Sequence, residues 1–219
     1  GCTEDPKTKT AARDDADAMR DHLSAGAWYG HERTYVVLGN QPIDRLGHSY
    51  THGQPFDRRA WCLAERAMSA LVKDASALID MRRLEGTEES LKEIVTKGAE
   101  RAAPMAPDAF HQLLEAGLRD GTLSFVRGED DMRSLSIVYQ DTFLEAFDAT
   151  SSLYYPRLGW TDAQAIELCA GLLYAHVHGA LGSLDLLNLD FNQIADEGAC
   201  RLAACFTDLS DQAQHASRL

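Results

Sequence analysis

The sequence predicts an α/β fold in which short parallel strands alternate with helices and the C-terminal part consists of two β-α units. Two observations carry this prediction: a strand, a helix and a second strand follow one another in the first half, and a hydrophobic pattern recurs near the end. The 219 residues are 45% hydrophobic and 25% charged, which is typical of a globular protein. The predicted parts are a flexible arm at 1–10, a small α/β module at 11–86, a helical middle at 87–149 and the two units with a tail at 150–219.

The first half contains the strand-helix-strand order. An alanine-rich helix with an acidic outer face is predicted at 11–23, and the β-branched run TYVVL predicts a strand at 34–38 that ends before Gly39. An amphipathic helix at 61–73 and a short buried strand at 76–81 follow. Because a helix connects the two strands, we expect them to pair in parallel.

A loop of about twenty residues, 39–59, separates the first strand from the helix. A loop of this length in a compact domain is typical of a functional or partner-covered segment. It contains His48 and His52, but neither this pair nor His176 and His178 has a Cys, Asp or Glu at the usual ligand spacing. Glycine-rich phosphate loops and the GxSxG hydrolase pattern are absent from the sequence as well, so we predict no metal and no cofactor.

The middle of the chain is predicted to be mainly helical. Amphipathic helices are expected at 88–101 and at 107–118, with a proline at the start of the second. The run TLSFV predicts a short strand at 122–126. A third helix, 129–147, begins with three acidic residues that suit the positive end of the helix dipole.

The most specific signal is a pattern near the C-terminus. LDLLNLDFNQI at 184–194 matches L-x-x-L-x-L-x-x-N-x-I, the pattern of leucine-rich repeats. We expect Leu187 and Leu189 to point inward from a short strand, and Asn192 to satisfy the backbone where the chain leaves that strand. A helix is predicted from Asp196, and its apolar positions are expected to return to the same core. These positions are Ala199, Leu202, Ala203 and Phe206.

A shift of 34 residues gives a second copy of the pattern, in which Leu153 falls on Leu187 and Tyr155 on Leu189. The spacing exceeds the roughly 20 to 29 residues of ordinary repeats, and the excess lies in the insertion at 173–183. We expect any specific function of this part to involve that insertion. Since two units enclose too little core, the helices of 88–148 are predicted to cover one side, and the other side is less well protected.

The segments PMAPDAFHQLLEAGL, LYYPRLGWTDAQAIELC and LNLDFNQIADEGACRLAACF resemble the C-terminal half of a set of algal, dinoflagellate-type proteins that end in leucine-rich repeats of the ribonuclease-inhibitor kind. YTHGQPFDRRAWCLAERAMSALVKDASALIDM is similar to the segment that precedes it in those proteins. Together these stretches cover about three quarters of the chain. The resemblance implies an architecture and no particular activity.

A second, weaker resemblance concerns WCLAE at 61–65, which is similar to the WCxxE box of Toll/interleukin-receptor-type domains. In the members that cleave NAD the matching glutamate is catalytic, so the resemblance assigns that role to Glu65. A carboxylate in an apolar cleft can stabilise the positive charge that develops on ribose as nicotinamide leaves. The alternative is that Glu65 is a solvated helix residue or pairs with Arg66.

The five cysteines are an odd number without a CxxC pair, so we expect reduced thiols. Cys62, Cys169 and Cys200 occupy apolar positions of helical patterns and are predicted to be small buried hydrophobes.

The charge balance disfavours two kinds of partner. Asp and Glu number 34 against 21 Lys and Arg, which gives a formal net charge of −13. Attraction to nucleic-acid phosphates or to an anionic membrane surface is therefore not expected. The sequence also lacks an apolar run of the roughly 20 residues that cross a membrane, so no membrane span is predicted.

These observations predict a non-catalytic protein that presents a repeat surface to a protein partner or stabilises a larger assembly of several subunits. The acidic composition suits a basic partner. The competing prediction is an NAD-cleaving or nucleotide-binding enzyme that uses Glu65. The residues predicted to contact a partner lie in or beside the repeated units: Tyr154, Arg157, Asp190, His176 and His178.

Overall fold

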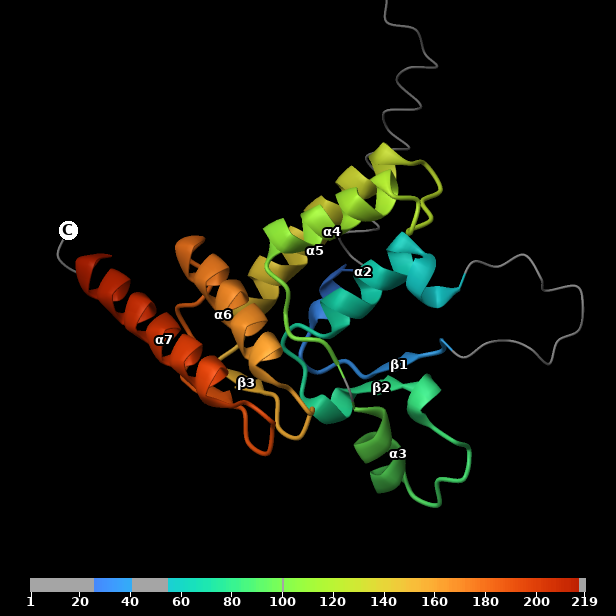
Figure 1. Cartoon of the computed structure of the whole chain (residues 1–219), viewed down its shortest axis with the longest axis horizontal. Coiled ribbons are helices and arrows are strands. Elements are labelled where there is room, and N and C mark those ends of the chain that lie inside the picture. Colours follow the sequence, from blue (N-terminus) through green and yellow to red (C-terminus); the bar gives the residue numbers. More distant parts are fainter. Residues whose placement is uncertain (1–25, 41–54, 100, 217–219) are drawn as a thin grey trace, which may run out of the picture.

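The computed structural model describes residues 26–40, 55–99 and 101–216, and the side chains up to residue 210. Within this part, helices alternate with short parallel strands, as the α/β prediction requires (Figure 1). The arm at 1–10, the helix at 11–23 and most of the loop at 39–59 lie outside the described residues, and so do His48 and His52.

The first strand pair joins β1 (Val36–Leu38) to β2 (Leu78–Asp80), with α2 (Ala60–Ser69) between them in the chain. The strands are parallel, with Val36 opposite Leu78, which confirms the predicted pairing. The helix ends four residues earlier than the predicted 61–73, because the chain turns at Ala70 and carries the side chains of residues 71–73 into the interior. Short 3-10 turns precede α2 and stand on both sides of β2, at Phe56–Arg58, Ala75–Ala77 and Met81–Arg83.

The middle contains α3 (Leu91–Gly98), α4 (Pro107–Arg119) and α5 (Glu129–Ala149). The predicted strand at 122–126 is wrong, since only Ser124 forms a bridge, with Arg59. The N–H groups of Val126 and Arg127 instead donate to the buried Asp131 carboxylate, each at 2.8 Å. The N–H groups of Thr122 and Leu123 donate to the Gly117 carbonyl at the end of α4, so these donors go to the two neighbouring helices rather than to a sheet.

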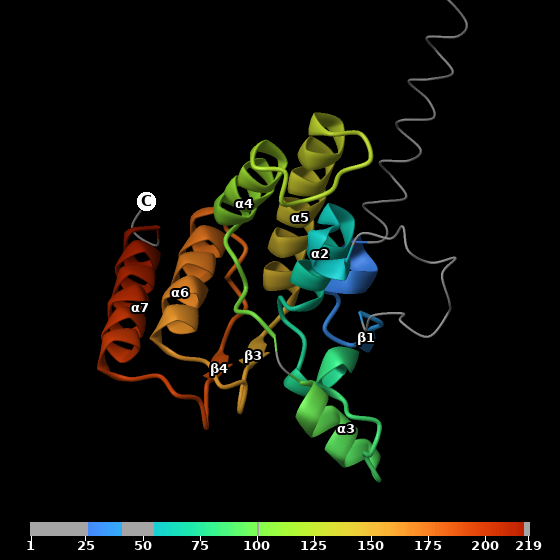
Figure 2. The ribbon, with the colours of Figure 1, turned by 45° about the vertical axis from the view of Figure 1, so that its right-hand side comes forward.

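The second strand pair joins β3 (Ser152–Tyr154) to β4 (Leu186–Asn188), again in parallel. Leu153 lies opposite Leu187, so the separation of paired residues equals the 34-residue shift found in the sequence. Each strand is followed by a helix, α6 (Asp162–Val177) and α7 (Asp196–Ala216), and these two helices pack side by side (Figure 2).

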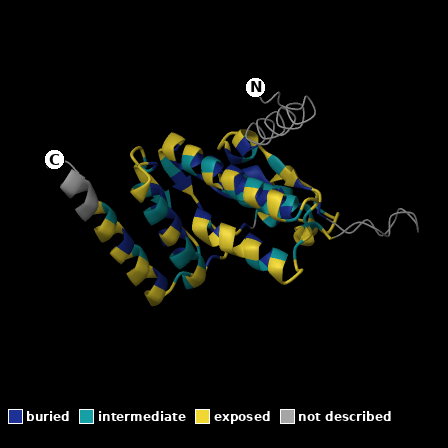
Figure 3. Ribbon diagram, turned by 90° about the horizontal axis from the view of Figure 1, so that it is seen from above, coloured by how far each residue is buried: buried dark blue, intermediate teal, exposed yellow. Residues whose placement is uncertain are grey.

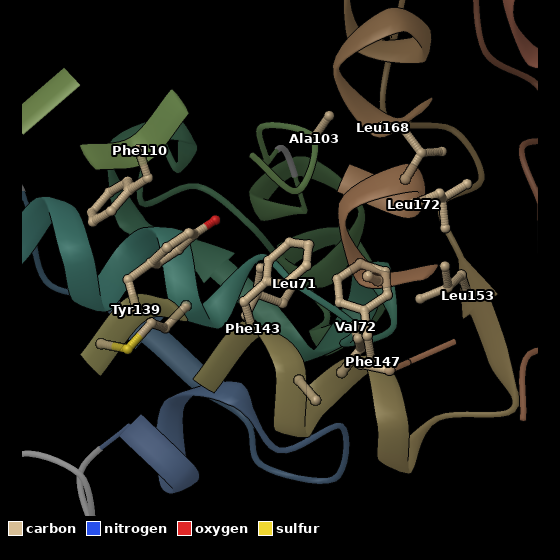
Figure 4. Packing of buried hydrophobic residues seen from close by; sticks show 14 of the residues in the cluster. Leu71, Val72, Ala103, Phe110, Tyr139, Phe143, Phe147, Leu153, Leu168 and Leu172 are labelled. Atoms are coloured by element: carbon tan, nitrogen blue, oxygen red, sulfur yellow. The ribbon is translucent and has the colours of Figure 1, made fainter. Parts of the chain in front are cut away.

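One hydrophobic core joins α2, α4, α5, β3 and α6. The rings of Phe110 in α4 and Tyr139 in α5 stack with centroids 3.9 Å apart, and Phe143 and Phe147 continue the row along α5 (Figure 4). Leu153 of β3 joins the same cluster, so the C-terminal units rest on the helical middle as predicted. None of the helices in the described residues is long and apolar enough to span a bilayer.

Candidate interaction surface

The turn that follows each C-terminal strand is built around the Asn192 side chain. Its Oδ1 accepts from the N–H groups of Leu158 at 3.0 Å and Trp160 at 3.1 Å. Its Nδ2 donates to the carbonyl oxygens of Tyr155 at 2.7 Å and Leu189 at 2.9 Å. One amide thus satisfies four backbone groups, three of which belong to the other unit, which is the role that the sequence predicts for it.

The two units also share an unusual backbone conformation. Arg157 and Phe191, which are 34 residues apart, have φ angles of 58° and 59°. Residues with large side chains rarely adopt this left-handed region, and such strain concentrates at functional positions. The Arg157 guanidinium lies over the Phe191 ring, 4.0 Å from its centroid, and Phe191 is 72% exposed. The result is a cation-capped aromatic side chain that faces solvent.

Three of the predicted partner-contacting residues come together at this end of the strands. Arg157 N–H donates to the Asp190 carbonyl at 3.0 Å, and Tyr154 pairs with Asn188 across the sheet. Tyr154 and Asp190 are exposed. The sequence therefore predicts residues that lie close together here, but it misses Phe191. The signal that could have identified Phe191 is its separation of 34 residues from Arg157, the same shift as between the two units.

His176 and His178 lie elsewhere, at the C-terminal end of α6. Because the strands and α6 run in opposite directions, this end is remote from the turn that holds Arg157 (Figure 2). The His178 ring stacks on Tyr174 with centroids 4.1 Å apart. His176 lines an open cavity of about 480 Å³ together with residues of the 173–183 insertion and the outer part of α7, among them Leu181 and Phe206.

The outer side of α7 is uncovered, which corrects the prediction that its apolar positions return to the core. Leu202 is partly buried against the core, but Ala199, Ala203 and Phe206 are exposed, the last to 42%. Figure 3 shows the colour of exposed residues along much of α7. The face that packs carries Leu202, Cys205 and Leu209 instead. The counterparts of the exposed residues 34 positions earlier are all buried: Ala165, Cys169 and Leu172. Those three are buried in α6, against which α7 packs, whereas no described element packs on the corresponding side of α7.

Glu65 is half-buried on α2, close to Tyr29. Burial raises the pKa of its carboxyl, while a hydrogen bond from the Tyr29 hydroxyl and the nearby Arg59 oppose this shift. Arg66 pairs with Asp57 at 3.4 Å, and no pair with Glu65 is found among the described residues. Glu65 does not line any of the three cavities described for this part of the chain.

The thiols show no sign of activation. Burial raises the pKa of Cys62, and it raises that of Cys205 to about 12, so both favour the protonated form. Cys169 is buried as predicted, but Cys200 is exposed, because it lies on the uncovered side of α7. The described residues contain no group of three or more His, Cys, Asp or Glu side chains that could hold a metal ion.

Two buried cations escaped the sequence analysis. Lys73 and Arg101 are the last residues of the helices predicted at 61–73 and 88–101, and neither side chain is predicted to lie in the interior. Both are instead buried, Lys73 with its Nζ donating to the His31 carbonyl and to Thr34 Oγ1. The apolar run AAPMAP directly after Arg101 is the one signal in the sequence that the chain stays in the interior there.

Comparison with models of protein families, with curated proteins and with solved structures finds no match to this chain.

Proposed function

We propose that the protein is a non-catalytic interaction protein, and that residues 150–216 form two leucine-rich-repeat-like units whose open side receives a partner. The observation that carries this proposal is the contrast between Leu172, which is fully buried, and its counterpart Phe206, which is 42% exposed. The same contrast holds for two further pairs of positions along α6 and α7. In stacked repeats each unit covers the one before it, so an exposed interior face indicates a place for one more unit.

The chemistry of the open side defines the partner. β4 is an edge strand of a two-stranded parallel sheet, so its outer backbone groups are available for a further strand. The adjacent helix offers Ala199, Ala203 and Phe206, two small positions and one large one on the same face. We therefore propose that the partner is another protein that contributes a strand parallel to β4 and a helix against α7.

The turn beside the strands would supply specificity. Phe191 and Arg157 project there next to Asp190, so the partner meets an aromatic ring, a cation and a carboxylate in one place. Aromatic and arginine side chains contribute most to interfaces of this kind. The net charge of −13 favours a basic partner.

The proposal can be tested by isolating the chain from its source at low and at moderate salt. The proteins bound to it are identified, and the mass of the complex is measured. We expect one stoichiometric protein partner that protects β4 from hydrogen exchange and is lost in Phe206→Asp. Val126→Asp is the matched control, since Val126 is 89% exposed but lies outside the C-terminal units. A partner that binds Phe206→Asp as tightly as the unchanged protein would contradict the proposal.

The competing function, cleavage of NAD at Glu65, has one supporting observation. Burial and the Tyr29 hydroxyl give this carboxyl an environment unlike that of a solvated helix residue, and its pKa is raised. Turnover of NAD that disappears in Glu65→Gln, with the fold intact, would establish this function in place of the interaction role.

A further inference from the structure

The side chain of Arg101 is buried without enough hydrogen-bond acceptors. It is 3% exposed, and it lies where the first half of the chain meets β3. Its Nη2 donates to the Tyr154 carbonyl at 3.0 Å, and its guanidinium lies 4.7 Å from the centroid of the Tyr155 ring. Nε and Nη1 have no acceptor among the described residues.

No carboxylate of the described residues lies in ion-pair contact with Arg101, although the charge of the nearby Asp74 favours its charged form. Among the described residues, neither Arg101 nor the nearby Lys73 forms an ion pair. Burial and the positive charge of the nearby Arg101 lower the pKa of Lys73 to about 8. A buried cation with unused donors is costly, and proteins usually supply it with an anion.

Arg101 also lines a cavity of about 210 Å³ between α2, the segment 101–105 and the α4–α5 pair. Apart from Arg66 and the backbone, its walls are almost entirely apolar. They include Leu63, Ala67, Leu78, Ala103, Met105 and Phe110. The only hydroxyl in the lining, that of Tyr139, is already bound to the Met105 carbonyl at 2.7 Å. Arg66 and Arg101 thus line a cavity whose other walls are almost entirely apolar, and Arg101 is the one of the two whose buried Nε and Nη1 have no acceptor among the described residues.

We propose that this cavity binds a small apolar monocarboxylate, with the carboxylate on the Arg101 guanidinium and the hydrocarbon against α2 and Phe110. Charge-assisted hydrogen bonds to a carboxylate would use donors that the protein leaves free. A 150 Å³ cavity holds benzene, so this one has room for about eight to ten non-hydrogen atoms. A phosphate or another polyanion suits the cavity less well, because the walls apart from Arg66 and Arg101 are apolar and would leave its remaining oxygens without donors.

The position of Arg101 connects this site to the proposed interaction surface. Its backbone carbonyl accepts from Trp160 Nε1 at 2.9 Å, and its Nη2 holds the end of β3. The proposed ligand site does not depend on the interaction function, and either one can fail without the other.

Calorimetric titration of the whole chain with octanoate tests the proposal, with 1-octanol and acetate as probes that lack the charge or the hydrocarbon. We expect saturable octanoate binding and a higher melting temperature, and no comparable response to the other two probes. Arg101→Met should weaken octanoate binding by about 10- to 100-fold, the loss of a charged hydrogen-bond pair. Arg133→Met, at an exposed arginine of α5, is the matched control and should bind octanoate normally.

Ala67→Phe provides a second variant that keeps Arg101 and fills the cavity. It should abolish octanoate binding, and it decides the question if Arg101→Met does not fold. Absence of saturable octanoate binding, equal binding of octanol, or binding that survives both substitutions would each overturn the proposal.

Discussion

The two parallel strand pairs of this protein are alike in geometry and different in what surrounds them. β1 and β2 are closed by charged groups: Asp80 at the end of β2 accepts from Asn40 Nδ2 at 2.8 Å and from the Arg82 N–H at 2.9 Å. Lys73 holds the chain before β1 through His31 and Thr34. At the turns after β3 and β4 the backbone is bonded by a neutral amide, that of Asn192, and a charged group, the Arg101 guanidinium, donates to the backbone at the end of β3.

This difference predicts how the stability of each strand pair depends on pH. Ionised groups make the stability of the first pair dependent on pH, whereas the Asn192 amide does not titrate, so its contribution to the second pair does not change with pH. An ionised carboxylate only accepts hydrogen bonds and an ammonium group only donates them, whereas the amide of Asn192 does both. Substitutions at four positions test the comparison.

Replacement of the amide should have the largest effect. Asn192→Leu leaves two N–H groups and two carbonyls without their partner, and we expect a loss of about 4 kcal/mol in the free energy of unfolding. The loss should be the same at pH 6 and pH 9. Urea unfolding followed by circular dichroism measures it, and a loss below about 1 kcal/mol would mean that water replaces the amide.

Lys73→Met should remove a pH dependence from the first pair. The pKa of Lys73 is about 8 in the folded protein against 10.5 for an ordinary lysine, so between these values only the unfolded chain holds the proton. The unchanged protein therefore gains up to about 3 kcal/mol relative to the variant as the pH rises from 8 to 10.5. Because the difference between the two proteins is measured, other titrating groups cancel; a difference that stays constant with pH would contradict the account.

Asp80→Asn should have a smaller effect, with a pH dependence of the same sign as that of Lys73 but in the acidic range. Hydrogen bonds from Asn40 and Arg82 hold the pKa of Asp80 below 3.8 despite its burial, so its stabilising effect is present above that pH. We expect the variant to lose about 1 to 2 kcal/mol at pH 7. The difference should shrink as the pH falls below 3.8, which unfolding curves at pH 7, 5 and 3 would show.

The smallest effect is expected at Phe191, where two substitutions separate the backbone from the side chain. Phe191→Ala removes the contact with Arg157 but keeps a non-glycine residue at φ 59°. Phe191→Gly removes the contact and the strain together, so it should be more stable than the alanine variant by about 1 kcal/mol. Equal stabilities would show that the left-handed conformation costs little here.

The features of the fold that were predicted correctly are those set by the order of neighbouring elements or by the repeated pattern in the sequence. The parallel pairing of 34–38 with 76–81, the 34-residue register and the role of Asn192 all follow from spacing alone. The strand at 122–126 could not be rejected from its own residues, because the acceptors of the N–H groups at its two ends, the Gly117 carbonyl and the Asp131 carboxylate, belong to the helices on either side. The apolar pattern of a helix is the same whether or not another element packs on it. The exposure of Phe206 is therefore seen only in the structure, where α6 covers one side of α7 and no described element covers the other.

The candidate sites were less predictable than the fold. Tyr154, Arg157 and Asp190 are neighbours as expected, because they follow equivalent strands. Arg101 was not anticipated, since an arginine at the end of an amphipathic pattern normally extends into water. Its burial depends on Tyr154, Tyr155 and Trp160, more than fifty residues later in the chain.

The bonds of Asn192 also set an order of events during synthesis. The turn after β3 has two backbone N–H groups and one carbonyl that find their partner only in this residue, 32 to 37 positions later. A ribosome adds residues at about 5 to 20 per second, so Asn192 is synthesised about two to seven seconds after the residues of this turn. The first C-terminal unit therefore cannot complete its fold before the second has emerged, and the two mature together.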